Sequence, residues 1–227
     1  MYTPSTPEAL SILLPLYNSP NRYYHNLNHI YYCLNQFSKY LNSNLNKLPY
    51  HDNDKIIDAI WWHDAIYSPF SFEDSSNEIE SSLLYKNFTE SISPSTTTYM
   101  IDYIDEVQSC IEATANHLKY DEAIYAEIQT KGQDTPKAVM LDIDLIGFSR
   151  SVDDLDKDTD KIFKEYAVLN LPEYIMIDNR IKFLETMLTR ERLYYTDYFY
   201  QFETIARYNI SKHLNKLIKF NTIGRHS

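Results

Sequence analysis

The sequence predicts an all-α fold of about eight to ten helices. Apolar residues recur at offsets of three and four along most of the chain, which is the spacing of one buried helix face. No stretch shows the alternation of apolar and polar residues expected of a β-strand. The 227 residues include only three glycines, and no Asn-Gly or Asp-Gly pair that would favour a hairpin turn. Together these observations favour helices throughout.

We expect the helices to follow the apolar stripes in order. The first is predicted over residues 22–40, and the second over 54–67, where Asp54 is placed to cap the first turn. Pro136 suits the first turn of a later helix because this turn leaves its N–H groups unpaired, and Gly147 suits that helix's end. The remaining predicted helices are 76–88, capped by Ser75 or Ser76; 99–118; 136–147; an acidic helix opened by Ser151; 172–188; and 197–217.

The predicted helices are expected to form one domain. The polar connections between them are short, and the chain shows no internal repeat that would indicate several units. We expect a single domain over residues 1–227, with a core of about 8–168 and the helices of 171–217 packed on it.

Composition and charge disfavour several classes of function. The chain carries 21 Lys and Arg against 32 Asp and Glu, and the resulting net charge of −11 disfavours nucleic acid duplexes and anionic membranes as partners. No apolar run approaches the roughly 18 residues of a membrane span, and no basic stretch precedes the first apolar residues as in a secretory signal. Cys33 and Cys110 are too few for a disulfide framework, so we expect a cytoplasmic protein. Three dispersed glycines cannot build a phosphate-binding loop or a dinucleotide-binding turn.

Two His-Asp pairs differ in their surroundings. His51-Asp52 lies in a polar stretch where a turn or a helix cap accounts for it, whereas His63-Asp64 follows two tryptophans near the end of an apolar helix. Adjacent helical residues point about 100° apart, so both can reach one ion only at the seam between them. Burying this pair without a partner would be costly, and a partner is therefore expected for His63-Asp64.

Two further polar groups have an open interpretation. His25 and His29 are four residues apart and would share a helix face, either as metal or substrate ligands or as capping and core histidines. Asp142 and Asp144 interrupt an apolar helix, where buried carboxylates are normally paired with arginine or bound to a metal. Imidazoles combined with carboxylates suit a divalent ion such as Mn, Fe, Co, Ni or Zn.

Several short motifs follow one another along the chain. They are Arg22-x-Tyr24-His25-Asn26-Leu27-x-His29, Trp62-His63-Asp64-Ala65-x-Tyr67, Asn77-Glu78-x-x-Ser81, Ala113-Thr114-x-x-His117, Leu141-Asp142-x-Asp144-Leu145, Glu165-Tyr166, Arg192-Leu193-Tyr194-x-Thr196, Glu203 and Ala206-Arg207-x-Asn209. In this order, over about residues 8–215, they resemble the HD-domain superfamily of metal-dependent phosphohydrolases. The chain is most similar to the bacterial proteins described as predicted metal-dependent HD-superfamily phosphohydrolases.

The resemblance implies a set of site residues. The implied metal ligands, for one divalent ion of Mn, Ni, Fe, Co, Zn or Mg, are His29, His63, Asp64 and Asp144, with Asp142 as a less favoured substitute for Asp144. The implied catalytic residues are Asp64, Glu78, His25 and His117, of which Glu78 or Asp64 would orient the attacking water. The candidates for binding substrate are Arg22, Asn26, Arg180 and Arg192, with Arg190 as a further arginine near phosphate.

By this resemblance we expect a cytoplasmic hydrolase that cleaves a phosphomonoester or phosphoanhydride. Its substrate would be a nucleotide-like or other small phosphorylated metabolite. A bound divalent ion would lower the pKa of water from about 15.7 towards about 7 and polarise the phosphoryl group. The alternative is a non-catalytic HD module that binds a metal or a nucleotide as a sensor or scaffold.

Overall fold

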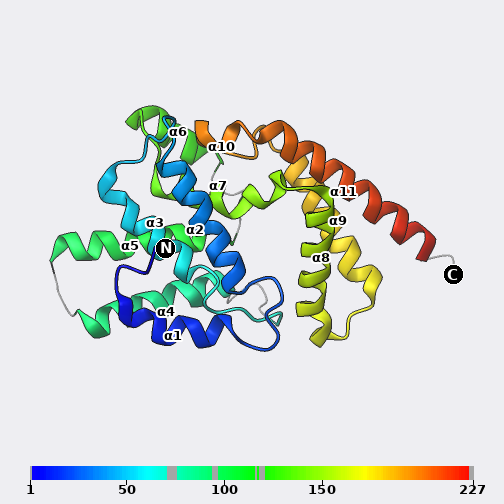
Figure 1. Cartoon of the computed structure of the whole chain (residues 1–227), viewed down its shortest axis with the longest axis horizontal. Helices are drawn as coiled ribbons and strands as arrows, with labels where there is room; N and C mark the ends of the chain where they lie inside the picture. Colours follow the sequence, from blue (N-terminus) through cyan, green and yellow to red (C-terminus); the bar gives the residue numbers. More distant parts are fainter. Residues whose placement is uncertain (1, 71–75, 94–96, 116, 118–120, 225–227) are drawn as a thin grey trace.

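Helices account for all regular secondary structure in the described part of the chain (Figure 1). The computed structural model describes residues 2–70, 76–93, 97–115, 117 and 121–224. Within these residues there are eleven α helices, of which α10 is a single turn, and four short 3-10 helices. The predicted all-α fold is confirmed. None of these helices has the length and apolar character needed to cross a membrane.

The helices have the following bounds. In chain order they are η1 (Pro7–Ala9), α1 (Leu10–Tyr17), α2 (Leu27–Leu41), η2 (Tyr50–Asp52), α3 (Asn53–Trp62), α4 (Asn77–Ile92), α5 (Thr98–Ala113), α6 (Asp121–Lys131), α7 (Pro136–Leu145), η3 (Ile146–Ser149), α8 (Val152–Tyr166), η4 (Ala167–Leu169), α9 (Glu173–Thr189), α10 (Asp197–Tyr200) and α11 (Glu203–Gly224). The prediction did not include α1 or α6.

Helix α7 joins two groups of helices. It packs against α2, α3 and α5, and its continuation η3 packs against α11, which also contacts α8 and α9. Figure 1 shows α1 to α5 on one side of the molecule and α8, α9 and α11 on the other, with α7 between them. One large apolar cluster contains Trp61 and Trp62 of α3, Ile143 of α7, and Phe199 and Ile210 near the C-terminus. The core thus extends from the first group of helices to the second.

Several helix ends follow the sequence signals. The side chain of Ser76 accepts a hydrogen bond from the N–H of Ile79 and caps α4, as predicted; Ser75 lies outside the described residues. The Ser151 hydroxyl likewise caps α8. Pro136 occupies the first turn of α7, whose N-cap is Thr135. Local side-chain chemistry therefore fixes these three starts.

Other predicted boundaries are wrong. Helix α2 begins at Leu27 because the backbone of Asn26 is extended and its side chain caps the helix, so residues 22–26 form a loop. Helix α3 begins at Asn53, directly after η2, so Asp54 lies inside the first turn and does not cap it. Gly147 lies within η3 without a positive φ. The single helix predicted over 197–217 is divided into α10 and α11 between Tyr200 and Glu203.

A buried carboxylate fixes α7 to the segment before α10. The side chain of Asp142 accepts hydrogen bonds from the backbone N–H groups of Tyr195 and Thr196, at 2.7 and 2.8 Å, and from the Thr196 hydroxyl at 2.8 Å. Asp142 is fully buried, and burial raises its pKa to about 7 although these donors favour the charged form. Two backbone donors would lose their partner without this side chain.

Replacing Asp142 should therefore lower stability. We expect Asp142→Ala to reduce the free energy of unfolding by about 1–3 kcal/mol, because buried N–H groups are left unpaired. Urea denaturation monitored by circular dichroism measures the change, with the exposed Asp160→Ala as the matched control. A loss no larger than that of the control would contradict the assigned role of Asp142.

Candidate metal centre

Four side chains from three parts of the fold converge at the centre of the molecule. His29 lies in the first turn of α2, His63 and Asp64 directly follow α3, and Asp144 lies in the last turn of α7. His63 Nε2 is 3.3 Å from His29 Nε2 and 3.1 Å from Asp64 Oδ2, and His29 Nε2 is 3.5 Å from Asp64 Oδ2. Asp144 Oδ1 is 3.6 Å from His29 Nε2 and 3.8 Å from His63 Nε2. His29, His63 and Asp64 are buried, and together they could hold a metal ion.

The end of α3 explains how adjacent residues reach one point. His63 keeps helical backbone angles as the C-cap of α3, and the side chains of His63 and Asp64 meet at the seam between their two directions, with Nε2 and Oδ2 3.1 Å apart. Arg22 fixes the backbone after the helix by donating to the carbonyl oxygens of Asp64 and Ala65, at 2.5 and 2.6 Å. The position of Asp64 thus depends on a guanidinium 42 residues earlier in the chain.

Hydrogen bonding leaves the facing atoms suited to a cation. The Nδ1 atom of His63 is 2.9 Å from the carbonyl oxygen of Ile60, which assigns the ring proton of a neutral His63 to Nδ1. Nε2 of that tautomer then directs a lone pair towards Asp64 and His29. Oδ2 of Asp64 is buried and accepts no hydrogen bond. Two ligand atoms that each lie about 2.1 Å from one ion are roughly 3.0–3.4 Å apart in octahedral or tetrahedral geometry. The separations between Nε2 of His29, Nε2 of His63 and Oδ2 of Asp64 are close to this range.

The imidazoles and the carboxylates of the centre stabilise each other's charged forms. Burial disfavours the charged forms, but it is outweighed by attraction between the imidazoles and the carboxylates. The nearby carboxylates of Asp64 and Asp144 raise the pKa of His63 above its usual value. The imidazoles in turn hold the pKa values of Asp64 and Asp144 well below the usual range. A divalent cation would replace the imidazole protons as the compensating charge.

His117 lies next to Asp144. Its Nε2 atom is 3.0 Å from Asp144 Oδ2, the oxygen that is turned away from His29 and His63. Asp142, two residues earlier on α7, faces the backbone of Thr196 instead. The two carboxylates of α7 thus point to different sides, and only that of Asp144 contacts the imidazoles of the centre, as the helical geometry predicts.

His25 is held by a buried carboxylate that the sequence analysis did not assign to the site. Its Nδ1 atom is 2.7 Å from Glu165 Oε2, and Glu165 Oε1 accepts the backbone N–H groups of His25 and Tyr24. The His25 ring also stacks on Tyr67, with centroids 4.0 Å apart. Glu165 appears in the motif Glu165-Tyr166, but no local pattern connects it with a histidine 140 residues away.

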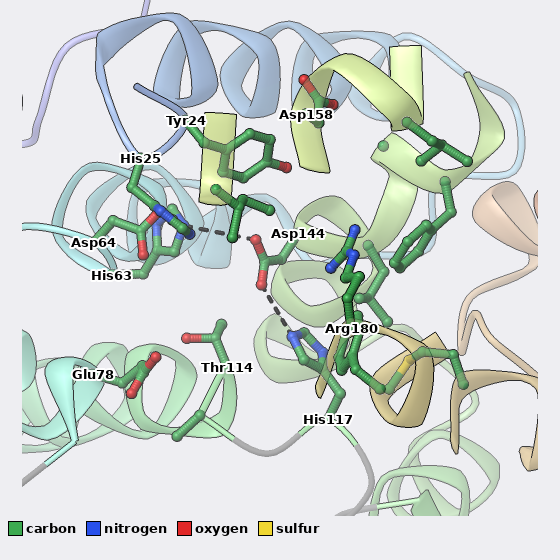
Figure 2. A pocket seen from close by; sticks show the side chains of 18 of the residues that line it. Tyr24, His25, His63, Asp64, Glu78, Thr114, His117, Asp144, Asp158 and Arg180 are labelled. Atoms are coloured by element: carbon green, nitrogen blue, oxygen red, sulfur yellow. Dashed lines mark hydrogen bonds and ion pairs between the residues drawn. The ribbon is translucent and has the colours of Figure 1, made fainter. Parts of the chain in front are cut away.

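The centre opens into a cavity of about 360 Å³. Figure 2 shows His63, Asp64, Asp144 and His117 around this space, with Glu78 and Arg180 on its other sides. The lining side chains that carry polar groups are Tyr24, His25, His63, Asp64, Glu78, Thr114, His117, Asp144, Asp158, Arg180 and Thr186. A second cavity, of about 130 Å³, reaches His29 and Asp144 from another side. The sequence analysis gave no role to Tyr24, Thr114 or Asp158.

Three residues predicted to bind substrate do not line the larger cavity. The guanidinium of Arg22 is directed at backbone carbonyl groups, including that of His25 at 3.2 Å. The side chain of Asn26 caps α2. Arg192 stacks on Tyr200, with its guanidinium carbon 3.8 Å from the ring centroid. This geometry does not support their predicted contact with substrate.

The other His-Asp pair lies apart from the centre. His51 is exposed, and the carboxylate of Asp52 accepts a hydrogen bond from Lys55 at 2.7 Å. His51 and Asp52 lie directly before the start of α3, at the opposite end of that helix from His63. The structure thus separates the two pairs as their sequence surroundings predict.

Comparisons with known proteins identified no related protein. No protein-family model, curated protein or solved structure matches the chain. The geometry of the described residues therefore carries the functional argument.

Proposed function

We propose that this protein is a metal-dependent phosphohydrolase that cleaves a phosphomonoester or phosphoanhydride of a small phosphorylated metabolite. The observation that carries the proposal is the buried convergence of His29, His63 and Asp64, of which His63 and Asp64 line a cavity that also holds the half-buried Arg180. The resemblance to the HD-domain superfamily points to the same chemistry. The proposal includes one divalent ion, bound by these three residues and Asp144.

The donor set fits a divalent ion of the Mn, Fe, Co, Ni or Zn type. Two imidazole nitrogens and two carboxylate oxygens neutralise its charge and leave coordination positions for water and substrate. The orphaned Oδ2 of Asp64 gains a partner when a cation is bound. Such an ion supplies a water of lowered pKa and withdraws charge from the phosphoryl oxygen.

Arg180 supports the choice of a phosphate substrate. Its side chain extends from α9 into the cavity, where Figure 2 shows it facing the same space as Asp144 and His117. Burial lowers its pKa to about 10, so the guanidinium stays charged at pH 7. A guanidinium can donate two parallel hydrogen bonds to phosphate oxygens. An anionic substrate would bind between Arg180 and the open coordination positions of the metal centre.

Other side chains orient the reacting groups. The Ile60 carbonyl fixes the ring of His63, and His117 fixes the carboxylate of Asp144. Glu78 lines the cavity from α4 and orients or deprotonates the attacking water. His25, held by Glu165, faces the same cavity and is placed to exchange a proton with the substrate.

Metal binding should distinguish the two carboxylates of α7. We expect Asp144→Ala to abolish binding of Mn²⁺ while leaving an α-helical protein, because it removes a ligand. Asp142→Ala should keep the metal, because its side chain faces the backbone of Thr196. Calorimetric titration of both variants with Mn²⁺ measures this, with His51→Ala as a further control that keeps the metal. The reverse order of the two aspartate variants would show that Asp142 is the ligand.

Hydrolysis should depend on the same residues. We expect purified protein to hydrolyse phosphate esters when supplied with Mn²⁺, Ni²⁺ or Zn²⁺, and to lose this activity on chelation. His63→Ala should lower kcat at least about a hundredfold, since the metal's contribution to the reaction is lost. Release of inorganic phosphate from a panel of nucleotides and sugar phosphates measures both effects. Metal binding without turnover on this panel would instead support the non-catalytic module.

A further inference from the structure

We infer that the cavity takes a phosphomonoester with a single phosphate and an apolar or aromatic organic part. The inference rests on the proposed function and narrows its substrate class. Its basis is a cavity that contains the metal centre and a single cationic side chain, Arg180, among its described lining residues, and that is also lined by a group of apolar side chains.

Arg180 and the metal centre offer binding groups for one phosphate. Arg180 is the only lysine or arginine among the described residues that line the cavity. It makes no ion pair with another described residue, and its buried Nε donates no hydrogen bond. Its guanidinium lies over the ring of Phe183, with its central carbon 5.2 Å from the centroid, which leaves the edges of the group free to donate. One guanidinium and the open coordination positions of one ion provide binding partners for one phosphate.

Acidic side chains exclude longer phosphate chains. Glu78 and Asp158 also line the cavity, and neither is a ligand of the proposed ion. Asp158 is paired with Arg150 and Lys161, neither of which lines this cavity. A triphosphate would bring further negative charges close to the carboxylate of Glu78, with Arg180 as the single cationic side chain among the described residues of the lining.

Apolar side chains also line the cavity. They include Phe148, Leu155, Ile162, Phe183 and Met187, from η3, α8 and α9. Phe148 and Phe183 are neighbours, with ring centroids 6.2 Å apart. An apolar ring in contact with these side chains would be removed from water, which favours an apolar organic part over a hydroxyl-rich one. The volume of about 360 Å³ is at the lower end of small-molecule sites, roughly 300–1,000 Å³.

Substrate preference tests the inference directly. The Mn²⁺-loaded full chain is assayed with phenyl phosphate, glycerol 3-phosphate and ATP. We expect kcat/KM for phenyl phosphate to exceed that for glycerol 3-phosphate by about tenfold or more, with ATP the poorest of the three. A preference for glycerol 3-phosphate or ATP would overturn the inference while leaving the proposed hydrolase in place.

Variants test Arg180 and the apolar side chains of the cavity separately. Arg180→Met should lower kcat/KM for all esters by roughly ten- to a hundredfold, since a charge-assisted hydrogen bond is lost, and the exposed Lys182→Met on the same helix should not. Ile162→Thr should reduce the phenyl over glycerol preference by roughly threefold or more. The half-buried Ile175→Thr, outside the cavity, is its control. Equal effects of variants and controls would overturn the inference.

Binding separates this inference from the catalytic proposal. Phenylphosphonate, which is not hydrolysed, is titrated calorimetrically into the Mn²⁺-loaded protein and compared with inorganic phosphate. We expect tighter binding of phenylphosphonate and its loss in Arg180→Met. Such binding without turnover of any ester would refute the hydrolase and keep the ligand class. Absence of binding, or binding no tighter than that of inorganic phosphate, would overturn the inference.

Discussion

The placement of two carboxylates, the buried Asp64 and the half-buried Asp144, among imidazoles is the constraint on which this structure depends. Asp64 and Asp144 lie at the junction of α2, α3 and α7, where water cannot compensate their charge fully. The ring nitrogens of His63 and His29 lie 3.1 and 3.5 Å from Asp64, and those of His117 and His29 lie 3.0 and 3.6 Å from Asp144. A divalent ion would satisfy this arrangement better than protons, because it would accept all the facing lone pairs at once. The proposed chemistry follows from the same requirement.

The surrounding fold holds the centre through charged side chains that bind backbone groups. Arg22 donates to the carbonyl groups after α3, Glu165 accepts the N–H groups before α2, and Asp142 accepts those before α10. Glu203, at the start of α11, accepts a hydrogen bond from the backbone N–H of Leu193. Each of these side chains fixes a connection that lacks the regular hydrogen bonds of a helix. These contacts position the loops beside the cavity, and they also give the charged side chains hydrogen-bond partners.

The sequence predicts the fold class and the members of the centre better than it predicts their supports. Helical spacing reveals most of the helices, and the apolar surroundings of His63-Asp64 distinguish it from His51-Asp52, whose histidine is exposed. The helix predicted over 22–40 starts late, because the cap at Asn26 is decided by contacts with the loop before it. The partnership of His25 with Glu165 joins residues 140 positions apart, and the commitment of Arg22 to backbone carbonyls also arises only in the folded chain. Long-range contacts of this kind leave no periodic or local signal.

The central claim is that His29, His63, Asp64 and Asp144 bind one divalent ion. Anomalous X-ray diffraction from crystals grown with Mn²⁺ tests it most directly, because it locates the metal independently of activity. The account predicts one strong peak about 2.0–2.3 Å from Nε2 of His29 and His63 and from a carboxylate oxygen of Asp64. A strong peak at His51 instead, or no peak at the buried centre in Mn²⁺-saturated crystals, would contradict it.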